Sequence, residues 1–72
     1  MLRTDYMALA NQWALLPEQI KACELMDRPG GVRNIGMNII IHTFDWSGVA
    51  VLTPAEFETV QKFRAVACVR AA

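Results

Sequence analysis

The residue types that could support acid–base or covalent chemistry are few in this chain and widely spaced. There is one histidine, His42, followed three positions later by Asp45, and two cysteines, Cys23 and Cys68. A catalytic interpretation makes His42 a general base oriented by Asp45, with a cysteine as nucleophile. A structural interpretation explains Asp45 by its hydrogen bond to the backbone two residues on in a turn. No G-x-S-x-G or H-E-x-x-H motif supports catalysis, so we predict a non-enzymatic protein with no catalytic residues.

Metal binding would have to recruit the same side chains. A structural zinc site typically contains a close pair such as C-x₂₋₄-C, whereas Cys23, His42 and Cys68 follow one another at separations of 19 and 26 positions. We therefore predict no metal and no cofactor. A Cys23–Cys68 disulfide is sterically possible if their helices pack together, but each cysteine also stands where a small apolar core residue would serve. We expect two buried thiols.

The segment Arg28–Arg33 places two arginines on either side of a diglycine, which could bind a phosphate. A P-loop requires G-x-x-x-x-G-K-[ST], and a dinucleotide-binding loop requires G-x-G-x-x-G between a strand and a helix. Neither motif is present, and the predicted order here is a helix followed by a strand. A helix stop followed by a turn accounts for the glycines, so we assign no anion site.

Four side chains are candidates for a protein interface. Trp46 lies at the tip of a predicted hairpin, where it either folds back over the strands or anchors a partner. Arg64 interrupts an apolar helical stripe and either reaches solvent, pairs with a carboxylate or contacts a partner. Val66 and Val69 fall outside that stripe, so the last turns of the helix are apolar on more than one side.

The C-terminal third contains the clearest helix signal. Thr53 is a predicted N-cap, Pro54 occupies the first helical position, and Glu56 stands where a capping box requires it. We predict a helix from Pro54 to about Arg70. Its apolar stripe consists of Phe57, Val60, Phe63 and Ala67.

The middle of the chain predicts a two-stranded antiparallel hairpin. The first strand is Asn34–Phe44, the turn is Asp45–Gly48, and the second strand is Val49–Leu52. The two-residue period of a strand separates two faces of the first strand. One face is apolar and contains Ile35, Met37, Ile39, Ile41 and Thr43. The other is mixed and contains Gly36, Asn38, Ile40, His42 and Phe44.

The N-terminal third predicts helix. Thr4 is a candidate N-cap, and Asp5 suits the positive end of the helix dipole. Pro17 disfavours helical geometry in the preceding residue, so we expect a break or kink there. A second helical segment follows with an apolar stripe of Ile20, Cys23 and Met26. It ends at Arg28–Gly31.

Composition restricts the class of protein. The 72 residues have zero net charge and are 54% hydrophobic, which argues against disorder and disfavours nucleic acid as a partner. The longest uncharged stretches, Tyr6–Pro17 and Asn34–Phe44, have 12 and 11 residues and are too short for a membrane helix. The start of the chain is a poor match to a signal peptide. We expect a cytoplasmic protein with reduced thiols.

Size and composition together predict self-association. A domain of this length buries only about 60% of the surface of its unfolded chain, and small domains usually need a disulfide, a metal or a second subunit. We predict one α+β domain over residues 1–72 that forms a homodimer. Sharing of the sheet is preferred, because Met37–Ile41 would otherwise be an exposed edge. Packing through the C-terminal helix is the competing geometry.

These features favour an interaction module, a small regulator or inhibitor that binds an unidentified larger protein. Two alternatives stay open. One is a dimeric β-ribbon that binds nucleic acid, and the other is a ligand-binding or enzymatic domain that uses Cys23, His42 and Asp45.

Overall fold

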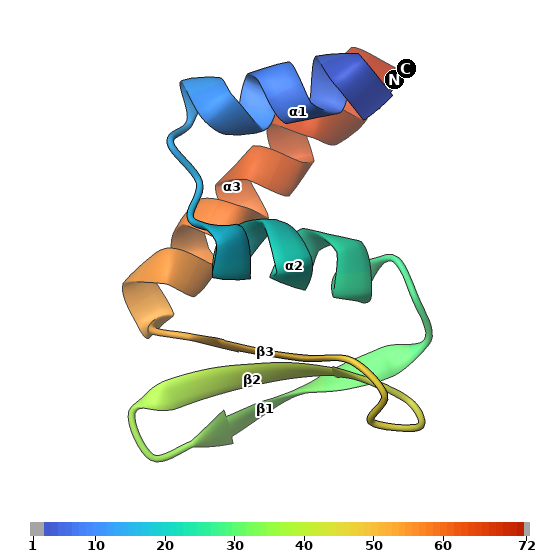
Figure 1. The fold of residues 1–72 in the computed structure, drawn as a ribbon. Helices are drawn as coiled ribbons and strands as arrows, with labels where there is room; N and C mark the ends of the chain where they lie inside the picture. Colours follow the sequence, from blue (N-terminus) through green and yellow to red (C-terminus); the bar gives the residue numbers. More distant parts are fainter. Residues whose placement is uncertain (1–2, 72) are drawn as a thin grey trace.

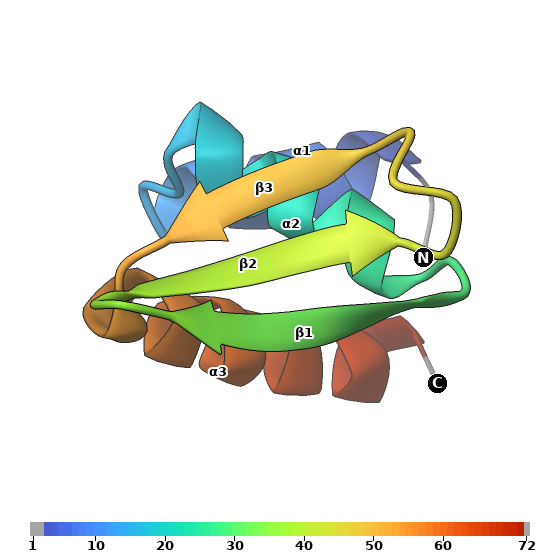
Figure 2. The same ribbon diagram turned by 90° about the horizontal axis from the view of Figure 1, so that it is seen from below.

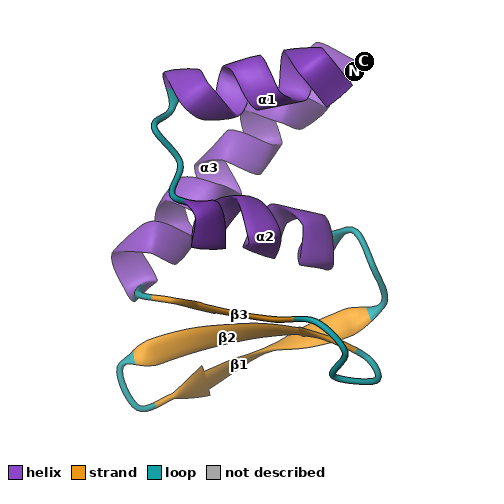
Figure 3. Cartoon of the chain, in the orientation of Figure 1, coloured by secondary structure: helices purple, strands orange, loops and turns teal. Residues whose placement is uncertain are grey.

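The computed structural model describes residues 3–71, which form a layer of helices on one side of an antiparallel sheet (Figures 1 and 3). The strand order is β1-β2-β3, so neighbours along the chain are neighbours in the sheet. The α+β class is therefore confirmed. The elements are α1 (Arg3–Gln12), α2 (Pro17–Met26), β1 (Gly30–Ile35), β2 (Asn38–Thr43), β3 (Val49–Leu52) and α3 (Pro54–Ala71).

The sheet has three strands, and the expectation of a two-stranded hairpin is wrong. Ile35 pairs with Asn38, so Gly36 and Met37 form a two-residue loop near the start of the predicted first strand. Gly36 has a φ of +61°, the conformation that a two-residue hairpin favours at a glycine in this position. The chain reverses here, and the diglycine segment upstream becomes part of β1 instead of a loop.

This reversal corrects the predicted strand faces. Ile39, Ile41 and Thr43 do share the face that packs against the helices, and Ile41 and Thr43 are buried. Ile35 does not share that face, because the turn at Gly36–Met37 interrupts the two-residue alternation. The turn also makes β2 the central strand. The run Met37–Ile41 is consequently no exposed edge, and the free edges belong to β1 and β3.

The predicted break near Pro17 is confirmed, although α1 ends earlier, at Gln12. The linker contains Ala14 with a φ of 53°, a left-handed conformation that a helix cannot continue through. Because α1 begins at Arg3, Thr4 lies inside its first turn and does not precede the helix as an N-cap.

Gln19 joins the starts of α2 and α3. Its Oε1 accepts a hydrogen bond from the Leu16 N–H at 2.7 Å, and its Nε2 donates to the Glu56 carbonyl oxygen at 3.2 Å. The side chain is buried, so these bonds satisfy a polar group that would otherwise be costly inside the protein. Nothing in the helical periodicity identifies this residue as buried.

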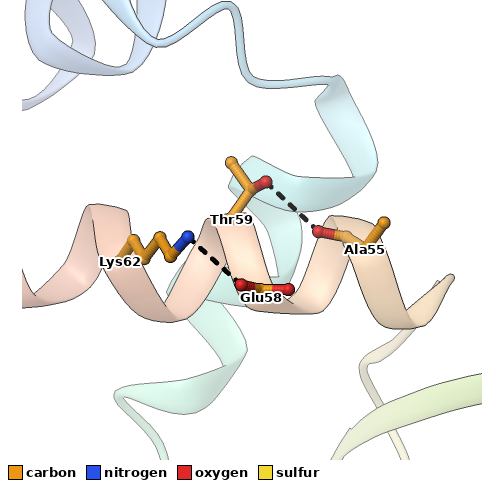
Figure 4. A network of polar contacts seen from close by, with 4 residues as sticks. All are labelled: Ala55, Glu58, Thr59 and Lys62. Atoms are coloured by element: carbon orange, nitrogen blue, oxygen red, sulfur yellow. Dashed lines mark hydrogen bonds and ion pairs between the residues drawn. The ribbon is translucent and has the colours of Figure 1, made fainter.

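The capping box of α3 is confirmed. The Thr53 N–H donates to Glu56 Oε1 at 2.8 Å, and the Glu56 N–H donates to Thr53 Oγ1 at 3.2 Å. Val60, Phe63 and Ala67 of the predicted stripe are buried. On another side of this helix, Lys62 pairs with Glu58 at 3.1 Å and the Thr59 hydroxyl donates to the Ala55 carbonyl oxygen (Figure 4).

Phe63 is the centre of the helical layer. Its ring receives Tyr6 and Trp13 in edge-to-face contacts, with centroids 5.4 and 5.8 Å away. Leu52 and Ile41 bring the sheet into the same buried cluster. The core thus lies between the helices and one face of the sheet, and the other face lies outside it. Among residues 3–71, no helix has the length and hydropathy needed to cross a membrane.

We expect Gly30→Ala to destabilise the fold because a Cβ built there collides with the His42 carbonyl oxygen and lies 2.9 Å from Thr43 Cα. Separating β1 from β2 should lower the free energy of unfolding by about 1–3 kcal/mol. The measurement is urea unfolding followed by circular dichroism. Met37→Ala is the control, since the Met37 side chain is 83% exposed in the loop at the other end of the same strand pair. Equal loss in both variants would contradict the close-approach explanation.

Candidate functional site

The structure does not bring Cys23, His42 and Asp45 together. Cys23 lies on α2 in the core, on the helical side of the sheet. His42 follows the inward-facing Ile41, so its ring lies on the opposite side, where it stacks on Trp46. The sheet therefore separates the thiol from the imidazole. Among residues 3–71, no group of His, Cys, Asp or Glu side chains is arranged to hold a metal ion.

Asp45 organises the turn between β2 and β3, as the structural interpretation expects. Its Oδ1 accepts hydrogen bonds from the Thr43 hydroxyl at 3.0 Å and from the Ser47 N–H at 3.1 Å. The bonds from Ser47 and then Thr43 hold the pKa of the Asp45 carboxyl below its usual value. The carboxylate is thus occupied by the turn, and His42 instead places Nδ1 2.9 Å from the Thr43 carbonyl oxygen.

Trp46 folds back over the sheet, which is one of the two alternatives left open by the sequence. Its ring stacks on the His42 imidazole, with centroids 3.7 Å apart and planes within 3°. A Cβ built on Gly31 would lie 3.2 Å from His42 Nε2, so the missing side chain at Gly31 leaves room for the imidazole. Trp46 has a φ of 62° and is still 47% exposed.

Arg33 completes this arrangement. Its guanidinium carbon lies 5.5 Å from the centroid of the Trp46 ring, within the range of a cation–π contact. Gly31, His42 and Arg33 reach the same side through the β1–β2 register, in which Gly31 opposes His42. An arginine, an indole and an imidazole from three separate segments therefore meet on one side of the sheet.

We call this side the outer face. Figure 2 shows it from below, with the strands in front and all three helices behind them. It combines apolar side chains with one permanent cation and no carboxylate. Its residues are Gly31, Arg33, Ile35, Asn38, Ile40, His42, Trp46, Val49 and Val51.

The other interface candidates lie on α3. Arg64 donates to Asp27 Oδ1 at 2.7 Å, so it pairs with a carboxylate of its own chain. Val66 is half-buried and packs against the core, whereas Val69 is 76% exposed. Trp46 and Val69 are therefore on different surfaces, and the four candidates do not form one patch.

The two arginines around the diglycine do not converge. Arg33 lies over Trp46, whereas Arg28 lines an open depression next to Pro29 and Phe44. A smaller hollow of about 130 Å³ lies between the end of α2 and β1, with Leu25 and Val32 among its lining residues. Neither hollow collects more than one of these cations, so the pattern in the sequence does not produce an anion site.

The expectation of two buried thiols is wrong for Cys68. Both cysteines are free, but Cys23 is buried and Cys68 is exposed. Burial raises the pKa of the Cys23 thiol above its usual value. Burial and a hydrogen bond with Cys23 also raise the pKa of the Tyr6 phenol. Cys23 is consequently a structural thiol in a junction between helices, without the lowered pKa of a reactive cysteine.

Sequence reasoning missed the outer face as a unit. It placed Asn38, Ile40 and His42 on one face, but it did not recognise β1, which supplies Arg33 and the glycine beneath His42. The available signal was Gly36, because a glycine between two β-branched segments is typical of a two-residue hairpin loop.

We expect the two thiols to differ in reactivity. In the native protein a disulfide reagent should modify Cys68 rapidly and Cys23 only when the fold opens, because the thiolate is the reacting form and burial disfavours it. The measurement is release of the chromophore from an aromatic disulfide, in buffer and in guanidinium chloride. Cys68→Ser should remove the rapid phase. Survival of that phase in the variant would contradict the assignment.

We also expect stability to fall at alkaline pH. Folding raises the pKa values of Cys23 and Tyr6, so their contribution to stability is complete below the unfolded thiol pKa of about 8.5 and is lost as the pH rises above it. Urea unfolding at a series of pH values measures this. Tyr6→Phe should reduce the fall above about pH 10, where an unperturbed phenol ionises. A free energy of unfolding that stays constant into this range would contradict the expectation.

Comparison with known proteins yields no relative from which a role could be transferred. The chain matches no protein-family model, no curated protein and no solved structure.

Proposed function

We propose that the protein is a non-enzymatic interaction module, a small regulator or inhibitor that acts as a homodimer and binds a larger protein through the outer face. The observation that carries this proposal is the one-sided sheet: the helices lie on one side, and no helix among residues 3–71 covers the outer face, where only Trp46 folds back over His42 (Figure 2). An exposed apolar surface with a polar rim is typical of a binding site.

Trp46 is the proposed anchor of this surface. Trp and Arg are the residue types that contribute most to binding hot spots, and Trp46 and Arg33 are in contact here. The Trp46 ring is held on one side by the His42 stack and is about half exposed. Because the indole is already fixed in position, less side-chain entropy is lost when a partner covers it.

The charge of Arg33 indicates which side chains a partner surface should contain. Among the described residues the ion pairs join Lys62 to Glu58 and Arg64 to Asp27, and neither involves Arg33. Arg33 lies on a face without carboxylates, surrounded by Ile40 and other apolar neighbours. A complementary partner surface would therefore be apolar, with an Asp or Glu positioned for the guanidinium.

The separation of Cys23 from His42 supports a non-enzymatic role over the enzymatic alternative. The contact between Arg33 and Trp46 is the observation that favours nucleic acid, since bases stack on aromatic and guanidinium planes. Against it, the chain has zero net charge, and phosphate binding depends on a surplus of basic residues. We therefore propose a protein partner.

The proposal predicts that Trp46→Ala weakens partner binding without unfolding the chain. Immobilised wild-type protein is used to capture proteins from extracts of its host, and captured proteins are then purified and titrated by calorimetry. We expect the dissociation constant to rise about tenfold or more with Trp46→Ala, the usual loss at a hot spot. Arg33→Gln should also weaken binding, and Val69→Ala should leave it unchanged.

Circular dichroism and thermal unfolding of each variant serve as the control for folding, and Trp46→Phe keeps an aromatic ring over His42. A set of captured proteins that is identical for wild type and Trp46→Ala would overturn the proposal. A salt-sensitive complex with duplex or single-stranded nucleic acid that Trp46→Ala abolishes would assign the outer face to the nucleic-acid alternative instead.

A further inference from the structure

The hydrogen-bonding pattern of the sheet identifies which backbone groups lie at its free edges. The Phe44 N–H donates to the Pro29 carbonyl oxygen at 2.8 Å. In an antiparallel pair every second residue pair is hydrogen-bonded, and the regular β1–β2 register continues this alternation along β1. The intervening residues point their N–H and C=O groups away from β2. These residues are Gly30, Val32 and Asn34.

The opposite edge of the sheet, that of β3, is partly occupied. The same alternation, set by the Thr43 N–H donating to the Gly48 carbonyl oxygen at 3.0 Å, directs the Val51 backbone away from β2. There the Val51 N–H donates to Glu18 Oε2 at 2.9 Å. Glu18 belongs to α2, which packs closely against β3. A carboxylate on this edge therefore occupies one of the two backbone donors, those of Val49 and Val51, that another strand would need.

The edge of β1 lacks these protections. Its six residues pair regularly with β2 and include no proline, and the one charged side chain, Arg33, leans over Trp46 on the outer face. Val32 is 49% exposed and Ile35 57% exposed. A long, regular edge strand with exposed apolar side chains is a template for another strand.

We infer that the edge of β1 pairs antiparallel with the β1 edge of a second copy of this chain, with Val32 on the twofold axis. This rests on the homodimer of the proposed function and names the edge and the register. Centring the pair on Val32 places all three edge residues opposite each other, Gly30 with Asn34 of the second copy and Val32 with its own counterpart. Centring it one residue away, on Arg33 or on Gly31, leaves one of them without a partner.

Side chains select the same register. With Val32 on the axis, each Arg33 lies opposite Gly31 of the second copy, which has no side chain to obstruct it. Centring on Arg33 would instead place two guanidinium groups directly opposite each other, and like charges in this position are destabilising. The two Val32 side chains meet on the helical side of the sheet, where β-branched pairs are favourable. Zero net charge leaves no overall repulsion between copies.

Two substitutions test this edge specifically. Val32→Pro removes the outward N–H and leaves the bonds to β2 in place, since proline is tolerated on an edge strand whose N–H faces solvent. Val32→Lys places two like charges at the axis. Val69→Lys is the matched control, because Val69 is also an exposed valine and lies on α3, the helix through which the competing dimer geometry would pack. Sedimentation velocity over a range of micromolar concentrations gives the number of subunits.

We expect wild type and Val69→Lys to sediment as dimers, and both Val32 variants as single chains of 8.1 kDa with unchanged circular dichroism. A wild type that remains a single chain throughout, or a dimer lost with Val69→Lys and kept with Val32→Lys, would overturn the inference. If the Val32 variants unfold, hydrogen exchange of the wild-type backbone amides tests the pairing instead. Protection of the Val32 and Asn34 amides from exchange should rise with protein concentration. Protection that does not change with concentration would reject the pairing.

Failure of this inference is distinguishable from failure of the proposed function. Trp46→Ala should weaken partner binding while the protein still sediments as a dimer, because Trp46 lies over His42 and not at the β1 edge. A single-chain protein that still binds its partner through Trp46 would overturn the pairing of β1 and leave the role of the outer face standing.

Discussion

Pairing of β2 on both of its sides is the constraint on which the rest of the structure depends. Once β1 and β3 are both bonded to β2, alternate residues of all three strands must face the helices or the outer face. This places Ile41 in the core and His42 outside it. The same alternation decides which backbone groups reach the free edges. The composition of the core, the composition of the outer face and the backbone groups at the free edges thus all follow from the pairing of β2 with both neighbours.

The parts of the fold that could be predicted are those with local causes. The α3 capping box, the break before Pro17 and the turn at Asp45 each depend on residues within a few positions of one another. The third strand could not be found in the same way. A diglycine normally interrupts regular structure, and Gly30 is tolerated because β1 approaches the backbone of His42 too closely for any Cβ. That close approach depends on the tertiary structure and cannot be read from the local sequence.

In the candidate site, too, features with local causes could be predicted and features that depend on the tertiary structure could not. The sequence identified Trp46 as unusual and Asp45 as a turn residue, but the contact of Trp46 with Arg33 depends on β1. The burial of Gln19 could not be anticipated either, because its bond to the Glu56 carbonyl oxygen joins segments that only the fold brings together. The apolar surplus of the composition has a simple counterpart: α2 and α3 pack on one side of the sheet, and apolar side chains such as Val51 and Ile35 are also exposed on the other side.

The carboxylate of Glu18 has a consequence for the size of any assembly. Sheets that are open at both edges can add strands without limit, which is how fibres grow. Here the Glu18 bond to Val51 makes β3 the less available edge of each chain, and joining two β1 edges uses the more available edge of both. The resulting complex would end in two β3 edges whose Val51 donors are already bonded, which disfavours growth beyond two subunits. One glutamate on α2 would thereby favour a dimer over a polymer.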